Sequence, residues 1–207
     1  MTYGDSMEYT EKMGRKIRSR SFPKSFSQFF HHWMLLLQGF VLPKYVAHLN
    51  PRATNESATI REFAQDNERT WEVLNKEPIQ RLVEQRYIRT SVLARNPEHD
   101  HKFVDERVRF ATDYLRFLLG VDPATIIGLE EQGSNETGRR PDMSRNPYVL
   151  NNQPFTALMV LLYKIRCNLF HGVKGYRIRS ERNEMLTSLG SKILEDIIEV
   201  FERPSRV

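Results

Sequence analysis

Large apolar residues recur every three or four positions in six stretches of this chain. The clearest stretch lies late in the sequence, with apolar residues at Phe155, Leu158, Met159, Leu162, Ile165 and Leu169. Residues at this spacing share one face of an α-helix, and that face is stable when other helices bury it. No stretch of comparable length alternates as a half-buried strand does. The spacing therefore predicts an all-α fold, a helical bundle of about five to six helices.

The other five stripes cover residues 26–40, 60–74, 79–93, 104–118 and 186–201. Prolines, a glycine and a capping residue mark several of their ends. Pro43 predicts a kink or an end of the first helix. Ser57 is expected to cap the second helix, and Pro78 to close it. The third helix is expected to stop near Pro97, and the fourth at Gly120.

The 207 residues are enough for one domain with a proper core. We expect a single helical domain over residues 24–203, preceded by a polar, basic arm over residues 1–23. A long loop is expected over residues 121–153, because prolines, glycines, serines and asparagines replace the helical spacing there. This loop, just before the stripe that begins at Phe155, is the segment that we expect to be flexible.

The charge and cysteine content narrow the classes of function. The net charge is +5, which permits an anionic partner such as RNA without requiring one. Cys167 is the only cysteine, so an intramolecular disulfide and a multi-cysteine zinc site are excluded. We therefore expect neither a metal nor another cofactor.

Two observations favour a cytoplasmic protein that does not span a membrane. The N-terminal residues include three carboxylates, Asp5, Glu8 and Glu11, and lack the apolar core of a secretory signal. The longest apolar run, residues 33–42, is about half of the roughly 20 residues that a membrane-spanning helix needs.

The stripe that begins at Phe155 ends in the sequence "YKIRCNLFHG", residues 163–172. Arg166 and His171 lie off the apolar stripe, about 140° apart around the helix axis, so both side chains can border one groove. Gly172 is expected to end the helix, which places His171 in the last turn. The helix dipole there favours a protonated imidazole, and an arginine one turn earlier suits phosphate oxygens.

An arginine and a histidine are a workable set for cleaving RNA without a metal, because RNA supplies its own nucleophile, the 2′-hydroxyl. His171 would move the proton, Arg166 would stabilise charge on the phosphate, and Asn168 would orient the histidine or the substrate. In a purely structural interpretation, Arg166 pairs with a carboxylate on a neighbouring helix and His171 caps its own helix. Cys167 also has two interpretations, an activated thiol nucleophile or a small residue facing another helix.

The string "IRCNLFHG", at the end of an apolar helix in an all-helical chain, resembles the signature of the HEPN superfamily (higher eukaryotes and prokaryotes nucleotide-binding domains). Members are helical bundles with an arginine, four to six intervening residues and a histidine near the end of a late helix. The resemblance implies a metal-independent endoribonuclease, often a toxin or effector in toxin–antitoxin, abortive-infection and other anti-phage systems. It also implies a homodimer, with the arginine and histidine of both subunits lining one composite cleft.

Arg166 and His171 match this hallmark, with four residues between them. Members usually carry a polar residue, commonly Asn, Asp or His, directly after the arginine, where this chain has Cys167. A subgroup paired with nucleotidyltransferase antitoxins has a tyrosine two residues after the histidine, where this chain has Val173, so that subgroup is not favoured. The alternative to an enzyme is a non-catalytic HEPN-like module that binds RNA or a partner protein.

Two basic clusters occur in the sequence. The first, at the N-terminus, is Arg15, Lys16, Arg18, Arg20 and Lys24; the second, directly after the motif, is Lys174, Arg177, Arg179 and Arg182 with Tyr176 among them. Each can guide an RNA backbone by phosphate contacts or be an ordinary solvated surface. The predicted substrate-binding residues are Lys174, Tyr176, Arg177 and Arg179. RNA is the predicted partner, and an antitoxin or a defence-system protein is a further one.

His31 and His32 are expected to have a packing or surface role. His31 and His32 are adjacent on the first helix and point about 100° apart, so joint metal binding is not expected. Trp33 and Trp71 lie on apolar stripes and are expected in the core.

Overall fold

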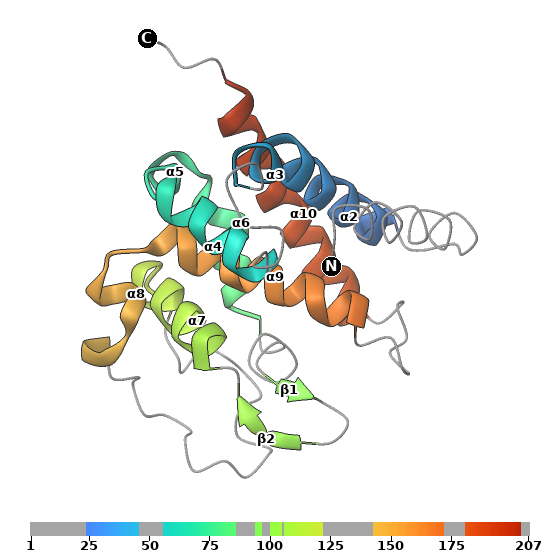
Figure 1. Cartoon of the computed structure of the whole chain (residues 1–207). Helices are drawn as coiled ribbons and strands as arrows, with labels where there is room; N and C mark the ends of the chain where they lie inside the picture. Colours follow the sequence, from blue (N-terminus) through green and yellow to red (C-terminus); the bar gives the residue numbers. More distant parts are fainter. Residues whose placement is uncertain are drawn as a thin grey trace. The chain divides into compact units, whose positions relative to one another are not determined.

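The computed structural model describes residues 24–45, 56–85, 94–96, 100–104, 106–121, 143–171 and 181–203 (Figure 1). This part of the chain is helical apart from turns and one short antiparallel strand pair, β1 (Ala94–Asn96) and β2 (Asp100–Val104). Six of the described helices have eight or more residues. The predicted all-α fold with about five to six helices is therefore confirmed.

The chain forms two compact units. The first combines Met1–Phe63 with Lys174–Val207, and the second is Ala64–Val173. The domain expected over residues 24–203 thus contains two centres of packing, each with its own buried apolar residues.

The first unit is built on two long helices, α2 (Lys24–Leu36) and α10 (Glu181–Glu202). Their apolar residues recur every three or four positions, so each helix has one continuous apolar face to bury. Trp33 is fully buried, as predicted. The buried apolar residues of the two helices are Phe26, Phe29, Trp33, Leu36, Leu186, Leu189, Ile193, Leu194, Ile197 and Ile198.

Three contacts fix the relative direction of α2 and α10. They are the hydroxyl oxygens of Ser25 and Thr187 at 3.1 Å, His32 Nδ1 and Ser191 Oγ at 3.0 Å, and the rings of Phe40 and Phe201 with centroids 5.6 Å apart. Both residue numbers increase from one contact to the next. The helices are therefore parallel, and both begin at the same end of the pair (Figure 1).

The helix that begins with α2 continues through a π-helical turn, η1 (Leu37–Val41), into α3 (Leu42–Tyr45). The N–H of Leu42 donates to the carbonyl of Leu37, five residues earlier. This wide turn comes directly before Pro43, whose ring would clash with the carbonyl four residues earlier in a regular helix. Pro43 thus marks a local distortion, one of the two predicted alternatives.

Five helices belong to the second unit: α5 (Thr70–Val73), α6 (Lys76–Val83), α7 (Glu106–Leu118), α8 (Pro147–Leu150) and α9 (Pro154–His171). A further helix, α4 (Glu56–Asp66), begins in the first unit and ends in the second. Within the second unit α9 packs against α7. Arg116 on α7 is buried, and its Nε donates to the carbonyl of Val83 at 2.8 Å. Because Val83 is the last residue of α6, this bond satisfies one of the carbonyls that a helix end leaves open.

The second predicted helix is in fact two helices. α4 ends at Asp66, residues 67–69 form a turn, and α5 begins at Thr70. Ser57 is not a cap, because it lies inside α4, where its carbonyl accepts a bond from Arg61 Nε. Pro78 does not close a helix either. It is the third residue of α6, a position whose missing N–H costs no intrahelical bond.

The third and fourth helices are shorter than predicted. α6 ends at Val83, and Ala94–Asn96, expected in the same helix, form β1. Pro97 gives the physical reason at that end, because the residue before a proline is displaced toward extended backbone. Val104, expected in the fourth helix, belongs to β2, and α7 begins at Glu106.

The end of the predicted 121–153 loop is structured. It contains a 3-10 turn, η5 (Met143–Arg145), followed by α8. The side-chain oxygen of Asn146 accepts from the N–H of Tyr148 at 3.0 Å and so caps α8, while its Nδ2 donates to the carbonyl of Phe110 on α7 at 2.7 Å. One buried asparagine therefore both starts α8 and ties it to α7. Residues 122–142 of the predicted loop lie outside the described part.

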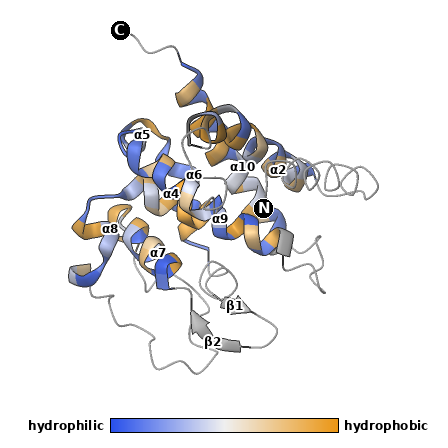
Figure 2. Ribbon diagram, viewed as in Figure 1, coloured by the Kyte–Doolittle hydropathy of each residue, from blue (hydrophilic) through white to orange (hydrophobic). Residues whose placement is uncertain are grey.

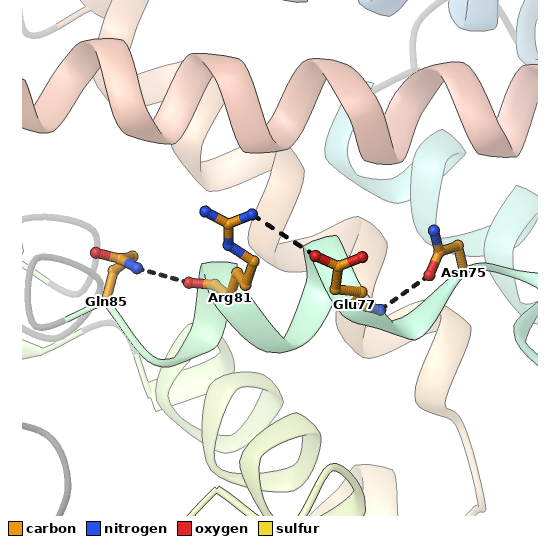
Figure 3. A network of polar contacts seen from close by, with 4 residues as sticks. All are labelled: Asn75, Glu77, Arg81 and Gln85. Carbon is orange, nitrogen blue, oxygen red and sulfur yellow. Dashed lines mark hydrogen bonds and ion pairs between the residues drawn. The ribbon is translucent and has the colours of Figure 1, made fainter.

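A row of polar contacts runs along the exposed side of α6 (Figure 3). The side chain of Asn75 accepts from the N–H of Glu77 at 3.0 Å, and the carboxylate of Glu77 lies 3.6 Å from the guanidinium of Arg81. Gln85 donates to the carbonyl of Arg81 at 2.8 Å. The Asn75 cap defines the start of α6, whereas the exposed ion pair contributes little to stability.

Gly120 ends α7, as predicted. Its φ is +65°, its N–H donates to the carbonyl of Phe117 at 3.3 Å, and the N–H of Val121 donates to the carbonyl of Arg116 at 2.9 Å. These two bonds form a Schellman motif, which requires a left-handed residue at Gly120.

Gly120→Ala is therefore expected to lower the free energy of unfolding by about 1–2 kcal/mol, because a Cβ is unfavourable at positive φ. Urea denaturation measures this change. Gly39→Ala is the matched control, since Gly39 lies in η1 without a positive φ and a Cβ there meets no atom within 4 Å. An equal loss of stability in both variants would show that the left-handed conformation is not the cause.

Hydrophobic residues gather along α9 and on α7 and α10 (Figure 2). None of the helices in the described residues is long and apolar enough to cross a membrane.

Candidate functional site

Arg166 and His171 both lie on α9, whose first half runs through the core of the second unit. Every residue from Pro154 to Leu162 is buried, on all sides of the helix. The predicted stripe is confirmed at Phe155, Leu158, Met159, Leu162 and Ile165, whereas Leu169 is only half-buried. Because its first half is enclosed all round, α9 is a rigid support for the residues at its C-terminal end.

A carboxylate from another part of the chain caps the N-terminus of α9. Glu68, in the turn between α4 and α5, accepts from the N–H of Phe155 at 2.9 Å and from the N–H of Thr156 at 3.0 Å. It also accepts a short bond from the Thr156 hydroxyl. The negative charge lies at the positive end of the helix dipole, so charge and hydrogen bonds act in the same direction.

Burial has the largest effect on the pKa of the Glu68 carboxyl group. Desolvation raises the pKa of Glu68 above its ordinary value, and the bonds from Thr156 and Phe155 oppose that rise without cancelling it. Tyr114 on α7 lies nearby, and its pKa is raised by burial and then by the charge of Glu68. The Tyr114 hydroxyl donates to the side-chain oxygen of Asn152 at 3.2 Å. Asn152, with φ of 50°, lies in the turn that leads into α9.

The last two turns of α9 are less enclosed than its first half. Ile165 is buried, but the residues around it are half-buried. Arg166 belongs to this half-buried group, and its Nε atom is buried. A guanidinium held partly out of water attracts an anion more strongly than one that is fully solvated. The half-buried residues are Tyr163, Lys164, Arg166, Cys167, Asn168 and Leu169.

His171 is the last residue of α9, in the terminal turn where the sequence predicts it. It follows Arg166 by five positions, which corresponds to about 7.5 Å along the helix axis. Asn168 lies on the same two turns. The backbone thus places all three predicted catalytic residues within the final two turns of one helix. The side chain of His171 lies outside the described part.

The predicted substrate-binding residues follow α9 directly. Lys174, Tyr176, Arg177 and Arg179 lie outside the described residues, as do Arg15, Lys16, Arg18 and Arg20 of the N-terminal arm. Lys24 is the first residue of α2 and is exposed.

Four other residues discussed above, His31, His32, Trp71 and Cys167, lie in the described part of the chain. His31 is exposed, and His32 packs on α10, where its Nδ1 lies 3.1 Å from the carbonyl of Ser191. Trp71 was expected in the core but is half-buried, and the Nζ of Lys76 lies 4.6 Å from its ring centroid. Cys167 is a free, half-buried thiol.

Among the described side chains, no group of three or more His, Cys, Asp or Glu residues could hold a metal ion. The chemistry that the described end of α9 offers is that of a positive charge and polar groups. Such a set binds an anion and, with His171, can transfer protons.

No protein-family model, curated protein or solved structure matches this chain. The resemblance to the HEPN superfamily therefore rests on the residues at the end of α9 and on the all-α fold.

The sequence did not reveal Glu68 as the cap of α9. Glu68 and Phe155 are 87 positions apart, and no local pattern distinguishes Glu68 from the other acidic residues of its stretch. The sequence around Phe155 contains a weak indication that this helix needs a cap from elsewhere. Pro154 and Thr156 open an apolar stripe that has no acidic residue in its first turn, so its N–H groups need acceptors from elsewhere.

Proposed function

We propose that this chain is a metal-independent endoribonuclease of the HEPN type. The observation that carries the proposal is the placement of Arg166 and His171 on the final two turns of α9, a helix whose first half is fixed in a packed core. Arg166 is half-buried there, which suits binding of a phosphate group. A basic segment, residues 174–182, follows at once in the sequence.

The proposed reaction uses the 2′-hydroxyl of RNA as its nucleophile. The 2′ oxygen bonds to the adjacent phosphorus while the bond from phosphorus to the 5′ oxygen of the next nucleotide breaks. One proton leaves the 2′-hydroxyl and one is delivered to the departing 5′ oxygen, which gives a 2′,3′-cyclic phosphate and a 5′-hydroxyl. A histidine side chain can serve in either transfer. Arg166 stabilises the negative charge that develops on the phosphate oxygens.

The two proton transfers favour a homodimer. One imidazole cannot be the base and the acid of the same step, whereas His171 from two copies would supply one group for each. A composite cleft would also carry two copies of Arg166. We propose this dimer as the active form, with a role as a toxin or an anti-phage defence effector and with an antitoxin or another defence protein as a partner.

The alternative is a non-catalytic HEPN-like module that binds RNA or a partner protein. Cys167 favours it, because a half-buried thiol occupies the position next to Arg166 where members of the HEPN superfamily usually carry a polar side chain. A thiol is a poor substitute for an amide or carboxylate that orients a histidine. This module would bind RNA with unchanged affinity after His171→Ala.

Cleavage without a metal tests the proposal. Purified protein is incubated with a pool of mixed-sequence single-stranded RNA, either with magnesium or with excess EDTA. The same rate of cleavage is expected in both, because no step uses an ion. Loss of cleavage in EDTA would contradict the proposed chemistry, and binding of intact RNA without cleavage in either buffer would favour the alternative.

A further inference from the structure

Tyr163 is the residue at which the burial of α9 changes. Every residue from Pro154 to Leu162 is buried, and Tyr163 is the first residue of the helix that is only half-buried. Ile165 remains buried and marks the side of the helix that stays enclosed. Tyr163 is two positions from Ile165, which corresponds to about 160° around the helix axis. The ring of Tyr163 therefore starts from the side of α9 opposite to the enclosed one.

Tyr163 and Arg166 are neighbours on the surface of α9. They are three positions apart, so they lie about 60° apart around the axis, with their Cβ atoms about 5–6 Å from each other. The side chains of a helix lean toward its N-terminus, so Arg166 is directed toward the turn that carries Tyr163. Both side chains are half-buried. The ring and the guanidinium thus share one stretch of helix surface.

Tyr163 also falls within the arc between the two proposed catalytic positions. Positions 166 and 171 are about 140° apart around the axis, and position 163 lies about 60° from the first and about 80° from the second. Of the described side chains from residue 163 to residue 169, that of Tyr163 is the aromatic one. A flat ring in this arc is suited to contact a base, while Arg166 contacts the backbone of the RNA.

A half-buried tyrosine has the properties that base stacking requires. Its ring has an apolar face, and its side chain has few rotatable bonds, so ordering it on binding costs little conformational entropy. A ring that is already partly packed loses still less freedom. Stacking of bases on aromatic side chains is a general feature of single-stranded RNA recognition.

We propose that Tyr163 stacks on the base of a nucleotide next to the phosphate that Arg166 binds, and so restricts the site to unpaired RNA. This inference rests on the proposed function. Each phosphate of RNA links two nucleosides, so a phosphate at Arg166 brings a base close to the ring one turn earlier. A paired base is already stacked within its duplex, whereas an unpaired base can stack on the ring. Because every base has a flat face, Tyr163 supplies affinity for unpaired RNA of any sequence.

The test compares four full-length proteins: the wild type, Tyr163→Leu, Tyr163→Phe and Phe110→Leu. Tyr163→Leu removes the ring, whereas Tyr163→Phe removes only the hydroxyl. Phe110→Leu is the matched control, because Phe110 is a half-buried ring of the same unit that lies on α7 and not on the motif helix. Binding is measured by fluorescence anisotropy with a single-stranded, fully 2′-O-methylated RNA, which cannot be cleaved by 2′-hydroxyl attack. A second probe is the abasic form of the same oligonucleotide, which keeps the phosphates and lacks the bases.

Tyr163→Leu is expected to bind the methylated RNA about tenfold more weakly than the wild type, which is the effect of losing one stacked base. Tyr163→Phe and Phe110→Leu should bind as the wild type does. The abasic probe should bind equally to the wild type and to Tyr163→Leu, and the slope of log affinity against log salt concentration should be the same in both, because no phosphate contact is lost. Unchanged affinity of Tyr163→Leu for the methylated RNA would overturn the inference, and so would an equal loss with the abasic probe, in Tyr163→Phe or in Phe110→Leu.

Tyr163→Trp supplies a second measurement that does not depend on the stability of Tyr163→Leu. A stacked base should quench the fluorescence of the new indole when the methylated RNA is added, beyond any change in the wild type, whose own tryptophans are Trp33 and Trp71. The abasic probe should cause no such quenching. Equal fluorescence changes in Tyr163→Trp and the wild type would show that no base contacts residue 163.

Cleavage of unmethylated RNA separates this inference from the proposed function. Tyr163→Leu should show a KM about tenfold higher for single-stranded RNA, with kcat within a few-fold of the wild type. Normal cleavage by the wild type with no effect of Tyr163→Leu on KM, or equal cleavage of a fully paired duplex, would overturn the stacking inference alone. Base-dependent binding through Tyr163 without any cleavage by the wild type would overturn the ribonuclease proposal and leave Tyr163 as part of an RNA-binding module.

Discussion

Arg166→Ala and His171→Ala are each expected to lower the rate constant of RNA cleavage by about 10²–10³-fold. Removing Arg166 takes away the permanent charge that stabilises the phosphate in the transition state. Removing His171 takes away the group that transfers protons. Single-turnover kinetics on a defined RNA measures both effects on the chemical step.

Lys164→Ala is the matched control for this pair. Lys164 is a half-buried cation on the same two turns of α9, so its loss changes charge and packing in a similar way without removing a proposed catalytic group. Its cleavage rate should stay within a few-fold of the wild type. Arg166→Lys should recover only part of the rate, because an ammonium retains the charge but not the planar fork. Equal losses for Lys164→Ala and Arg166→Ala would contradict the assigned role of Arg166.

Glu68→Ala is expected to lower the free energy of unfolding by about 2 kcal/mol. The substitution removes the acceptor of the Phe155 and Thr156 N–H groups and of the Thr156 hydroxyl at the start of α9. Glu68→Gln keeps one acceptor oxygen and should lose less. Urea denaturation at neutral pH measures the difference, and equal stability of Glu68→Ala and the wild type would show that the cap contributes nothing.

The contribution of Glu68 to the free energy of unfolding should increase as the pH falls. Because the pKa of Glu68 is raised in the folded protein, the folded state binds a proton more readily than the unfolded state. The wild type should therefore gain stability relative to Glu68→Gln as the pH falls from above the raised pKa toward the ordinary value of 4.5. Denaturation of both proteins at neutral pH and near pH 4.5 tests this. A relative loss for the wild type in acid would contradict desolvation as the dominant cause.

The sequence predicted those parts of the fold that depend on helical spacing. The stripes of α2, α7, α9 and α10 are long, and most of their apolar residues are buried as expected, whereas Leu118 is exposed and Leu169 is half-buried. Helix boundaries that depend on a few residues of irregular backbone were not predicted. Residues 67–69 split the second helix, although the stripe runs on through Trp71, because periodicity does not register a single turn of irregular backbone.

In the candidate site too, the sequence predicts what depends on spacing within one helix, but not what depends on contacts between distant residues. The sequence predicts that His171 lies in the last turn of its helix, because the apolar stripe and Gly172 together define that end. The pairing of Glu68 with Phe155 and the parallel direction of α2 and α10 arise from contacts between residues 87 or more positions apart. Spacing within one helix carries no information about such contacts, so they emerge only from the packed structure.

The end groups of the RNA fragments test the central claim most directly. The protein is incubated with RNA in EDTA, and the fragments are examined for a 2′,3′-cyclic phosphate and a 5′-hydroxyl. Both groups are expected with the wild type, neither with the Arg166→Ala, His171→Ala double variant, and no cut is expected where the nucleotide 5′ to the cleaved bond is 2′-deoxy. Fragments with 5′-phosphate and 3′-hydroxyl ends, or cyclic phosphate ends produced equally by the double variant, would contradict the assignment of Arg166 and His171 as the catalytic pair.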